Sequence, residues 1–162
     1  MSLTQLGTNS AEGCVAPGIH KEVIQSIGTT ERQLLPEESG SVILMDATDS
    51  ITVRLPTPVA GMSFDFVTSV TVTASDTHKI ITKTIASEFI VGGIGSFSTA
   101  VAEGGDSFSA NGTTHVAITS NGSTTGGLIG QVFRLTAISA TQWVVSGNLV
   151  GTGTLATPFA TS

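Results

Sequence analysis

SVILMDATDSITVRLPTPVAGMSFDFVTSVTVT, residues 41–73, carries the clearest strand pattern in this chain. Apolar side chains recur at alternate positions in four short runs: Val42 and Leu44; Ile51, Val53 and Leu55; Phe64 and Phe66; Val70 and Val72. A period of two places each run on one face of a pleated sheet, while polar residues such as Arg54 and Asp65 face the other way. Turn residues at 47–50 and 56–61 separate the runs, so we predict three or four short antiparallel strands.

The rest of the chain carries the same kind of pattern. Further strands are predicted at residues 20–27, 79–85, 113–119, 127–138 and 143–149. The segment 79–85 also fits a helical stripe, but its Ile and Thr content favours a strand. Asn121-Gly122 is a strong hairpin signal between two of these strands. Short strands with turn signals every eight to twelve residues predict an all-β fold, an antiparallel β-sandwich or a small jelly-roll-like barrel.

The domain boundaries follow from where this pattern begins and ends. We predict an extended N-terminal arm at residues 1–18, a β-domain at 19–151 and a small-residue C-terminal tail at 152–162. The arm is polar and rich in turn residues, with isolated apolar side chains. Either it is a disordered tail, or it orders on a partner through its apolar anchors, which are Leu3, Leu6, Val15 and Ile19.

The composition points to burial against other protein chains. Charged residues make up 11% of the sequence, the net charge is -6, and the mean hydropathy is +0.34. No apolar run approaches the roughly 18 residues that span a bilayer, so we expect no membrane segment. A charge-poor, apolar chain of this size needs its surface covered, and we therefore predict a homotrimer.

Several partner and compartment classes are disfavoured by the same composition. The six Lys and Arg residues are scattered, so no basic stripe can neutralise phosphates and we expect no nucleic-acid binding. The single cysteine, Cys14, cannot form an intrachain disulfide. The first residues lack the basic and apolar regions of a signal peptide, which favours synthesis in a reducing cytoplasm.

No arrangement of residues predicts chemistry. The histidines at 20, 78 and 115 have no partner at metal-ligand spacing. Asp46, Asp49 and Asp76 flank turns and are expected to cap them. No nucleophile elbow or phosphate loop is present, and the Asn-Gly-Thr/Ser sequences at 111–113 and 121–123 are interpreted as turns. We therefore predict no catalytic, metal or cofactor site.

Three aromatic residues are predicted to lie in the core or at a subunit interface, namely Phe64, Phe66 and Trp143. Trp143 is the largest apolar side chain and begins a strand whose Val145 continues the same face. An exposed tryptophan at this position would instead indicate a platform for stacking on sugars.

Four segments resemble small β-domains in virion proteins of tailed bacteriophages. These segments are ESGSVILMD at 38–46, ITVRLP at 51–56, GMSFDF at 61–66 and WVVSG at 143–147. The resemblance covers about residues 35–151. Such domains occur in capsid decoration (cement) proteins, which are commonly trimers at threefold positions of the head, and in head or tail fibres. No catalytic residue carries over, because the family pattern contains none.

The resemblance implies a structural protein on the outer capsid surface of a virion, made in the host cytoplasm, with the major capsid protein as its partner. The leading hypothesis is a decoration protein that binds the assembled head as a trimer and stabilises it. The alternative is a head-fibre or tail-fibre module that adheres to host glycans, and a small hydrolase is a third class. The absence of Tyr and the single Trp disfavour the glycan-binding alternative.

Overall fold

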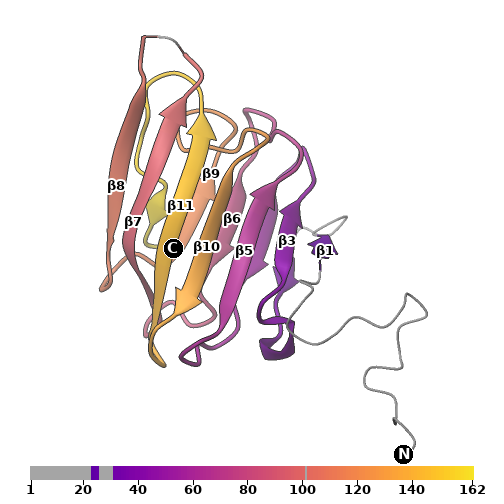
Figure 1. Ribbon diagram of the computed structural model, residues 1–162, viewed down its shortest axis with the longest axis vertical. Coiled ribbons are helices and arrows are strands. Elements are labelled where there is room, and N and C mark those ends of the chain that lie inside the picture. Colours follow the sequence, from indigo (N-terminus) through magenta and orange to yellow (C-terminus); the bar gives the residue numbers. More distant parts are fainter. Residues whose placement is uncertain (1–22, 26–30, 101) are drawn as a thin grey trace, which may run out of the picture.

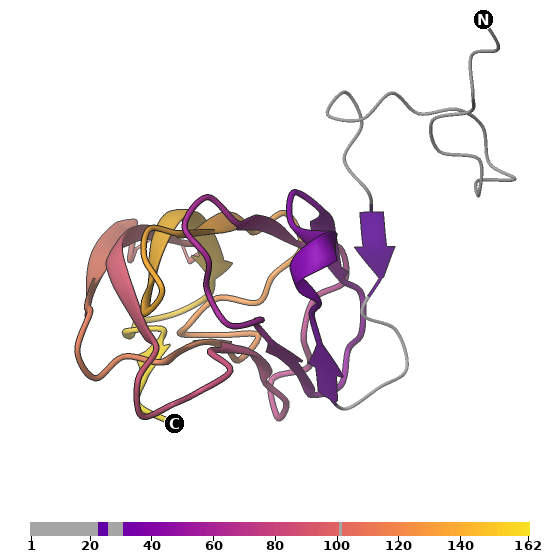
Figure 2. The ribbon, with the colours of Figure 1, turned by 90° about the horizontal axis from the view of Figure 1, so that it is seen from below.

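The chain folds into two β-sheets packed face to face. The computed structural model describes residues 23–25, 31–100 and 102–162, and these contain twelve strands and one short 3-10 helix, η1 (Pro36–Glu38). Figure 1 shows one sheet in front of the other, and Figure 2 shows the two layers from below. The prediction of an all-β sandwich is confirmed. The barrel alternative is not, because each sheet has two free edges.

The larger layer, sheet A, has seven strands. In spatial order they are β1 (Val23–Gln25), β3 (Val42–Met45), β5 (Ser63–Thr68), β10 (Val132–Ala137), β11 (Gln142–Gly151), β7 (Phe89–Ser98) and β8 (Gly105–Asn111). Sheet B has five strands, in the order β12 (Phe159–Ala160), β9 (Ala117–Ser120), β6 (His78–Ile81), β4 (Ile51–Arg54) and β2 (Glu31–Gln33).

The strand pairing differs from the predicted antiparallel arrangement. From β1 to β7 the chain alternates between the sheets, so the neighbours within each sheet run parallel: β1, β3 and β5 in sheet A, and β2, β4 and β6 in sheet B. Antiparallel pairs join β5 to β10, β10 to β11, β7 to β8, β6 to β9 and β9 to β12. A turn reverses the chain whether the next strand joins the same sheet or the facing one, so turn residues alone do not distinguish the two.

The face of β3 that lies in the core is also the opposite of the predicted one. Ile43 and Met45 are buried, whereas Val42 and Leu44 lie on the outer side and are half-buried. All four residues are apolar, so the run has no alternation to decide between its faces. Pairing decides it, because Ile43 lies beside Phe66 of β5, which is in the core.

The predicted strand around Val70 and Val72 is absent. Val72 is nevertheless buried, and its N–H donates to the carbonyl of Gly127. The strand predicted at 79–85 ends at Ile81, and Ile85 is exposed. The residues at these positions have strand propensity, but they lie in connections between the two sheets and do not form strands.

Asn121-Gly122 forms a turn but not a hairpin, because the connection links β9 in sheet B to β10 in sheet A. The Asn121 side-chain oxygen accepts hydrogen bonds from the N–H groups of Ser123 and Thr125, both at 3.0 Å. A buried glutamine holds the far end of this loop. Gln131 accepts from the Gly127 N–H at 2.7 Å and donates to the Ser120 hydroxyl at 3.0 Å.

The C-terminal segment is part of the domain and not a tail outside it. Phe159 and Ala160 pair with Ile118 and Ala117 of β9, and the Phe159 side chain belongs to the core. A two-residue strand among small polar residues is too short to show alternation, which explains why the pattern of residues 152–162 did not reveal it.

Aromatic rings form the centre of the core. The rings of Phe66 and Phe133 stack with centroids 5.2 Å apart, and Phe64 packs at 6.0 Å against Trp143. Trp143 is 0% exposed and its indole N–H has no hydrogen-bond partner among the described residues, so the side chain acts through packing. Removing it would leave a large cavity between the sheets.

We predict that Trp143→Ala lowers the free energy of unfolding by about 3–5 kcal/mol, because a large buried ring is lost and the surroundings cannot fully collapse. Denaturant titration followed by circular dichroism measures this change. The control, Val59→Ala, alters a side chain that is 58% exposed and should change stability by less than about 0.5 kcal/mol. Similar midpoints for the two variants would contradict this account of the core.

Candidate interaction surface

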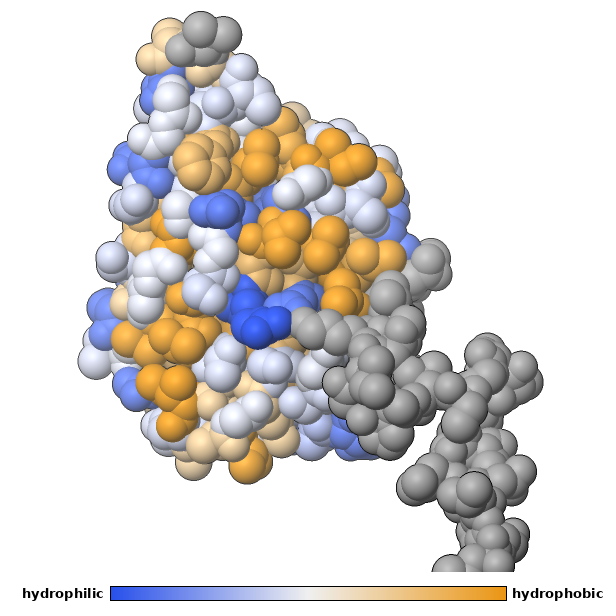
Figure 3. Space-filling view, in the orientation of Figure 1, coloured by the Kyte–Doolittle hydropathy of each residue, from blue (hydrophilic) through white to orange (hydrophobic). Residues whose placement is uncertain are grey.

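The outward side of sheet A gathers apolar side chains that a soluble sheet normally replaces with polar ones. Figure 3 looks onto this face and shows orange groups spread across it. We call it the sheet A outer face and define it by the residues that alternate with the core positions of β3, β5, β7, β8, β10 and β11. Its apolar members are Val42, Leu44, Val67, Phe89, Val91, Phe97, Val132, Val144 and Val150.

Strand register makes these residues neighbours. Val67 lies between Leu44 of β3 and Val132 of β10, which forms a row across three strands. Val144 lies beside Val91, and Val150 lies beside Phe97, on the adjoining strands β11 and β7. Side chains directly opposite each other in a sheet have Cβ atoms about 4.5–5.5 Å apart. The apolar residues are therefore contiguous within each row.

Charge on this face is confined to one ion pair. Asp65 of β5 and Arg134 of β10 lie opposite each other in register, and their side chains form a two-bond pair through Nε and Nη2 of the arginine, with Nη2 2.8 Å from Oδ2. Among the outward residues of the described sheet A strands, these are the charged ones. The outward residues of the described sheet A strands therefore carry no net charge, although the chain as a whole carries -6.

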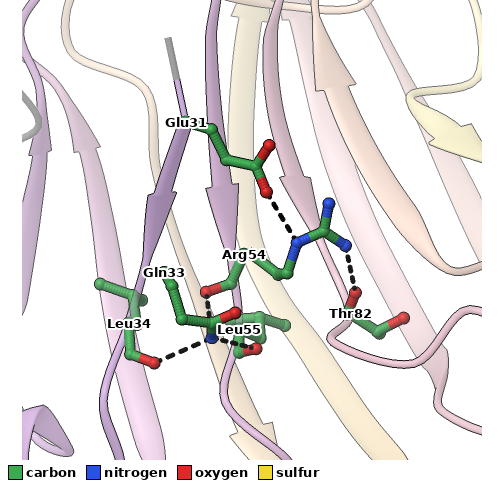
Figure 4. Close-up of polar contacts among 6 residues, drawn as sticks. All are labelled: Glu31, Gln33, Leu34, Arg54, Leu55 and Thr82. Carbon is green, nitrogen blue, oxygen red and sulfur yellow. Dashed lines mark hydrogen bonds and ion pairs between the residues drawn. The ribbon is translucent and has the colours of Figure 1, made fainter. Parts of the chain in front are cut away.

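The outward side of sheet B is different, because its charged and amide side chains hold its own edge strand (Figure 4). Arg54 Nε donates to Glu31 at 2.9 Å and Arg54 Nη1 approaches the Thr82 carbonyl at 3.4 Å. The Gln33 amide nitrogen reaches three backbone carbonyl oxygens, at 2.9 to 3.2 Å, those of Leu34, Arg54 and Leu55. The bonds from Arg54 to Glu31 and from Gln33 to the Arg54 carbonyl attach the three-residue strand β2 to β4.

Most of the remaining carboxylates lie in the connections at the ends and rim of the sandwich. They are Glu37 and Glu38 in η1, Asp46 and Asp49 after β3, Asp76 before β6, Glu88 before β7 and Glu103 before β8. The acidity of the molecule is thus concentrated away from the sheet A outer face.

The side chains that sequence reasoning singled out occupy separate places. Phe64, Phe66 and Trp143 are buried in the core of a single chain, and Leu3, Leu6, Val15 and Ile19 lie outside the described residues. The sequence analysis did not predict that the outward valines form a surface, because in an all-apolar run nothing indicates which side faces water. The low overall charge was the available signal for such a surface.

Polar side chains that could take part in catalysis or metal binding stabilise turns instead. Asp76 accepts hydrogen bonds from the N–H and hydroxyl of Ser50, at 3.2 and 2.8 Å, and so braces the turn before β4. The Asn111 side-chain oxygen accepts from the N–H groups of Thr113, Thr114 and His115. Within the described ranges, no group of three or more His, Cys, Asp or Glu side chains could hold a metal ion.

His78 is the one strongly buried titratable group with an altered pKa among the described residues. Its side chain begins β6, is 1% exposed, and neither ring nitrogen has a hydrogen-bond partner. Burial lowers the pKa of His78 below the ordinary 6.5 and outweighs the raising effects of the backbone at Ala47 and Asp49 and of the carboxylates of Asp46 and Asp76.

A scan against protein-family models and a search of curated proteins give no match to this chain. In the part of the chain that the structure describes, no helix combines the length and hydropathy needed to cross a membrane.

We predict that stability falls as the pH drops below 6.5, because the unfolded chain then binds a proton at residue 78 that the native chain does not. The slope approaches about 1.4 kcal/mol per pH unit and continues down to the lower pKa of the folded state. Urea titrations between pH 7.5 and 5.5 measure it.

His78→Leu should remove this slope, whatever it does to the stability at pH 7.5. Val59→Ala serves as the control, because it changes an exposed side chain that does not titrate and leaves residue 78 intact, and it should keep the wild-type slope. An unchanged slope in His78→Leu would show that another group causes the acid sensitivity.

Proposed function

We propose that this chain is a structural virion protein of a tailed bacteriophage, a capsid decoration (cement) protein that binds the assembled head as a trimer. The observation that supports this most strongly is the sheet A outer face. Contiguous apolar rows without net charge suit burial against other protein chains and are costly to leave in water. The resemblance of residues 38–66 and 143–147 to phage β-domains supports the same assignment.

The proposed mechanism is mechanical. Trimers sit on the outer capsid surface, and each contacts neighbouring copies of the major capsid protein. Residues 1–18 extend over the shell and attach through Leu3, Leu6 and Val15, together with the adjoining Ile19. A rupturing shell would lose the area buried by these contacts, so binding stabilises the closed head against the pressure of the packaged DNA.

The alternative is a head-fibre or tail-fibre module that adheres to host glycans. Sugar recognition by such a module would use an exposed aromatic platform, and Trp143 is in the core. Phe97, 52% exposed, is the large aromatic side chain that the described surface offers to a ligand. A single phenylalanine is a weak platform for sugars, so the decoration role has the better support.

We predict that the full chain binds phage heads assembled without it and raises the temperature at which they release DNA. Sedimentation with quantified bound protein, followed by melting in the presence of a DNA dye, measures both effects. The variant L3S/L6S/V15S/I19S keeps the length of the arm and removes its apolar anchors, so it should bind at least about tenfold more weakly.

The unbound variant should melt at the wild-type temperature, because the described strands, which begin with Val23 of β1, contain none of the substituted residues. Deletion of residues 1–18 should have the same two effects. If the full chain does not sediment with the heads, the decoration role is wrong. If the substitutions lower the melting temperature of the isolated chain, the anchors belong to the folded domain.

A further inference from the structure

We propose that the sheet A outer face is the surface through which copies of this chain associate with one another. The inference extends the proposed function, because it identifies the surface that holds the trimer together. The number of copies, three, is taken from that proposed function. It does not depend on whether the oligomer then binds a capsid.

Charge identifies a second copy as the occupant. Two copies that each carry a net charge of -6 repel one another in most orientations. The repulsion is weakest where the contacting surfaces hold no unpaired carboxylate. On this face the carboxylate of Asp65 is paired with Arg134 across β5 and β10. A basic partner would instead be drawn to the acidic ends of the sandwich, around Asp46, Asp49 and Asp76.

The shape and stiffness of the face suit packing against the same face of other copies. In a trimer, three copies of the face would meet around the threefold axis, each contacting its two neighbours through the side chains of alternate positions. Valine has few rotamers to lose, so ordering Val67, Val132 and Val144 at a contact costs little entropy. A stable interface needs about 800 Å² per partner, and the apolar residues are spread over several strands, with one row on β3, β5 and β10 and separate pairs on β11 and β7.

The central test places one charge on β10, the middle strand of sheet A, at the end of the row formed by Leu44, Val67 and Val132. Val132, 48% exposed, lies on β10 between Val67 and Asn148. Val132→Glu would bury a carboxylate at the proposed contact. The matched control is Val59→Glu, the same change at a valine that is similarly exposed but lies in the connection before β5.

Light scattering coupled to size-exclusion chromatography at micromolar concentration gives the mass. We expect three chains for the wild type and for Val59→Glu, and one chain for Val132→Glu. Circular dichroism melts of all three establish that the fold is retained. Raising the salt to 0.5 M should preserve the wild-type mass, because screening reduces repulsion between acidic copies and leaves apolar contacts intact.

If Val132→Glu does not fold, Val132→Thr replaces it, because threonine keeps the β-branched shape and removes one methyl group from the contact. Its self-association should be weaker by about tenfold in dissociation constant at unchanged secondary structure. Wild-type affinity in a folded Val132→Thr chain would count against the proposal.

Two outcomes overturn the assignment, namely a wild type that remains a single chain and a Val132→Glu variant that keeps the wild-type mass. If that variant keeps its mass but no longer binds heads, the face contacts the capsid and not a second copy. If the wild type is a dimer that Val132→Glu dissociates, the face is the contact and the proposed trimer is wrong. Head binding is measured separately, so the two proposals can fail independently.

Discussion

The structure depends on the pairing of β5 with β10 at the centre of sheet A. β5 ends the series of parallel strands that begins with β1, and its antiparallel pairing with β10 joins this series to the mixed part of the sheet formed by β10, β11, β7 and β8. Phe66 lies opposite Phe133 with the rings stacked, and Phe64 lies opposite Leu135 while packing against Trp143. Because residues so distant along the chain meet there, the two halves of the sheet are held together mainly by the burial of these rings.

The two sides of the sandwich use their outward residues differently. On sheet B, Gln33 and Arg54 bind backbone carbonyls and Glu31, so the polar groups stabilise the strand at that edge. On sheet A the outward residues are mostly valines and small polar side chains, with the Asp65–Arg134 pair as the charged element. Valine at these positions favours strand formation but leaves apolar area in water, so this side of the molecule is the one suited to association.

The long edge strand of sheet A is less available for pairing than the face. In β8, the N–H of Ser107 is bonded by the Asp106 carboxylate at 2.7 Å, and the N–H of Asn111 donates to His115 Nδ1 at 3.1 Å. An incoming strand would have to displace both bonds, and natural sheets protect their edges by such means. A partner of sheet A therefore meets side chains on its face more readily than backbone groups at this edge.

Alternation and turn residues are local properties of the chain, and they were enough to predict the all-β class, most of the strand positions and the burial of Phe64, Phe66 and Trp143. Which sheet each strand joins was decided only in the tertiary structure, since the turn at 47–50 is equally compatible with a hairpin and with a crossing to the facing sheet. Pairing with Phe66 likewise chose Ile43 over Val42 for the core, and pairing with β9 drew Phe159 into the fold. The outward rows of valines also depend on the tertiary structure. They form a surface only when several strands are paired in a fixed register, and that register is set by contacts between residues distant in sequence.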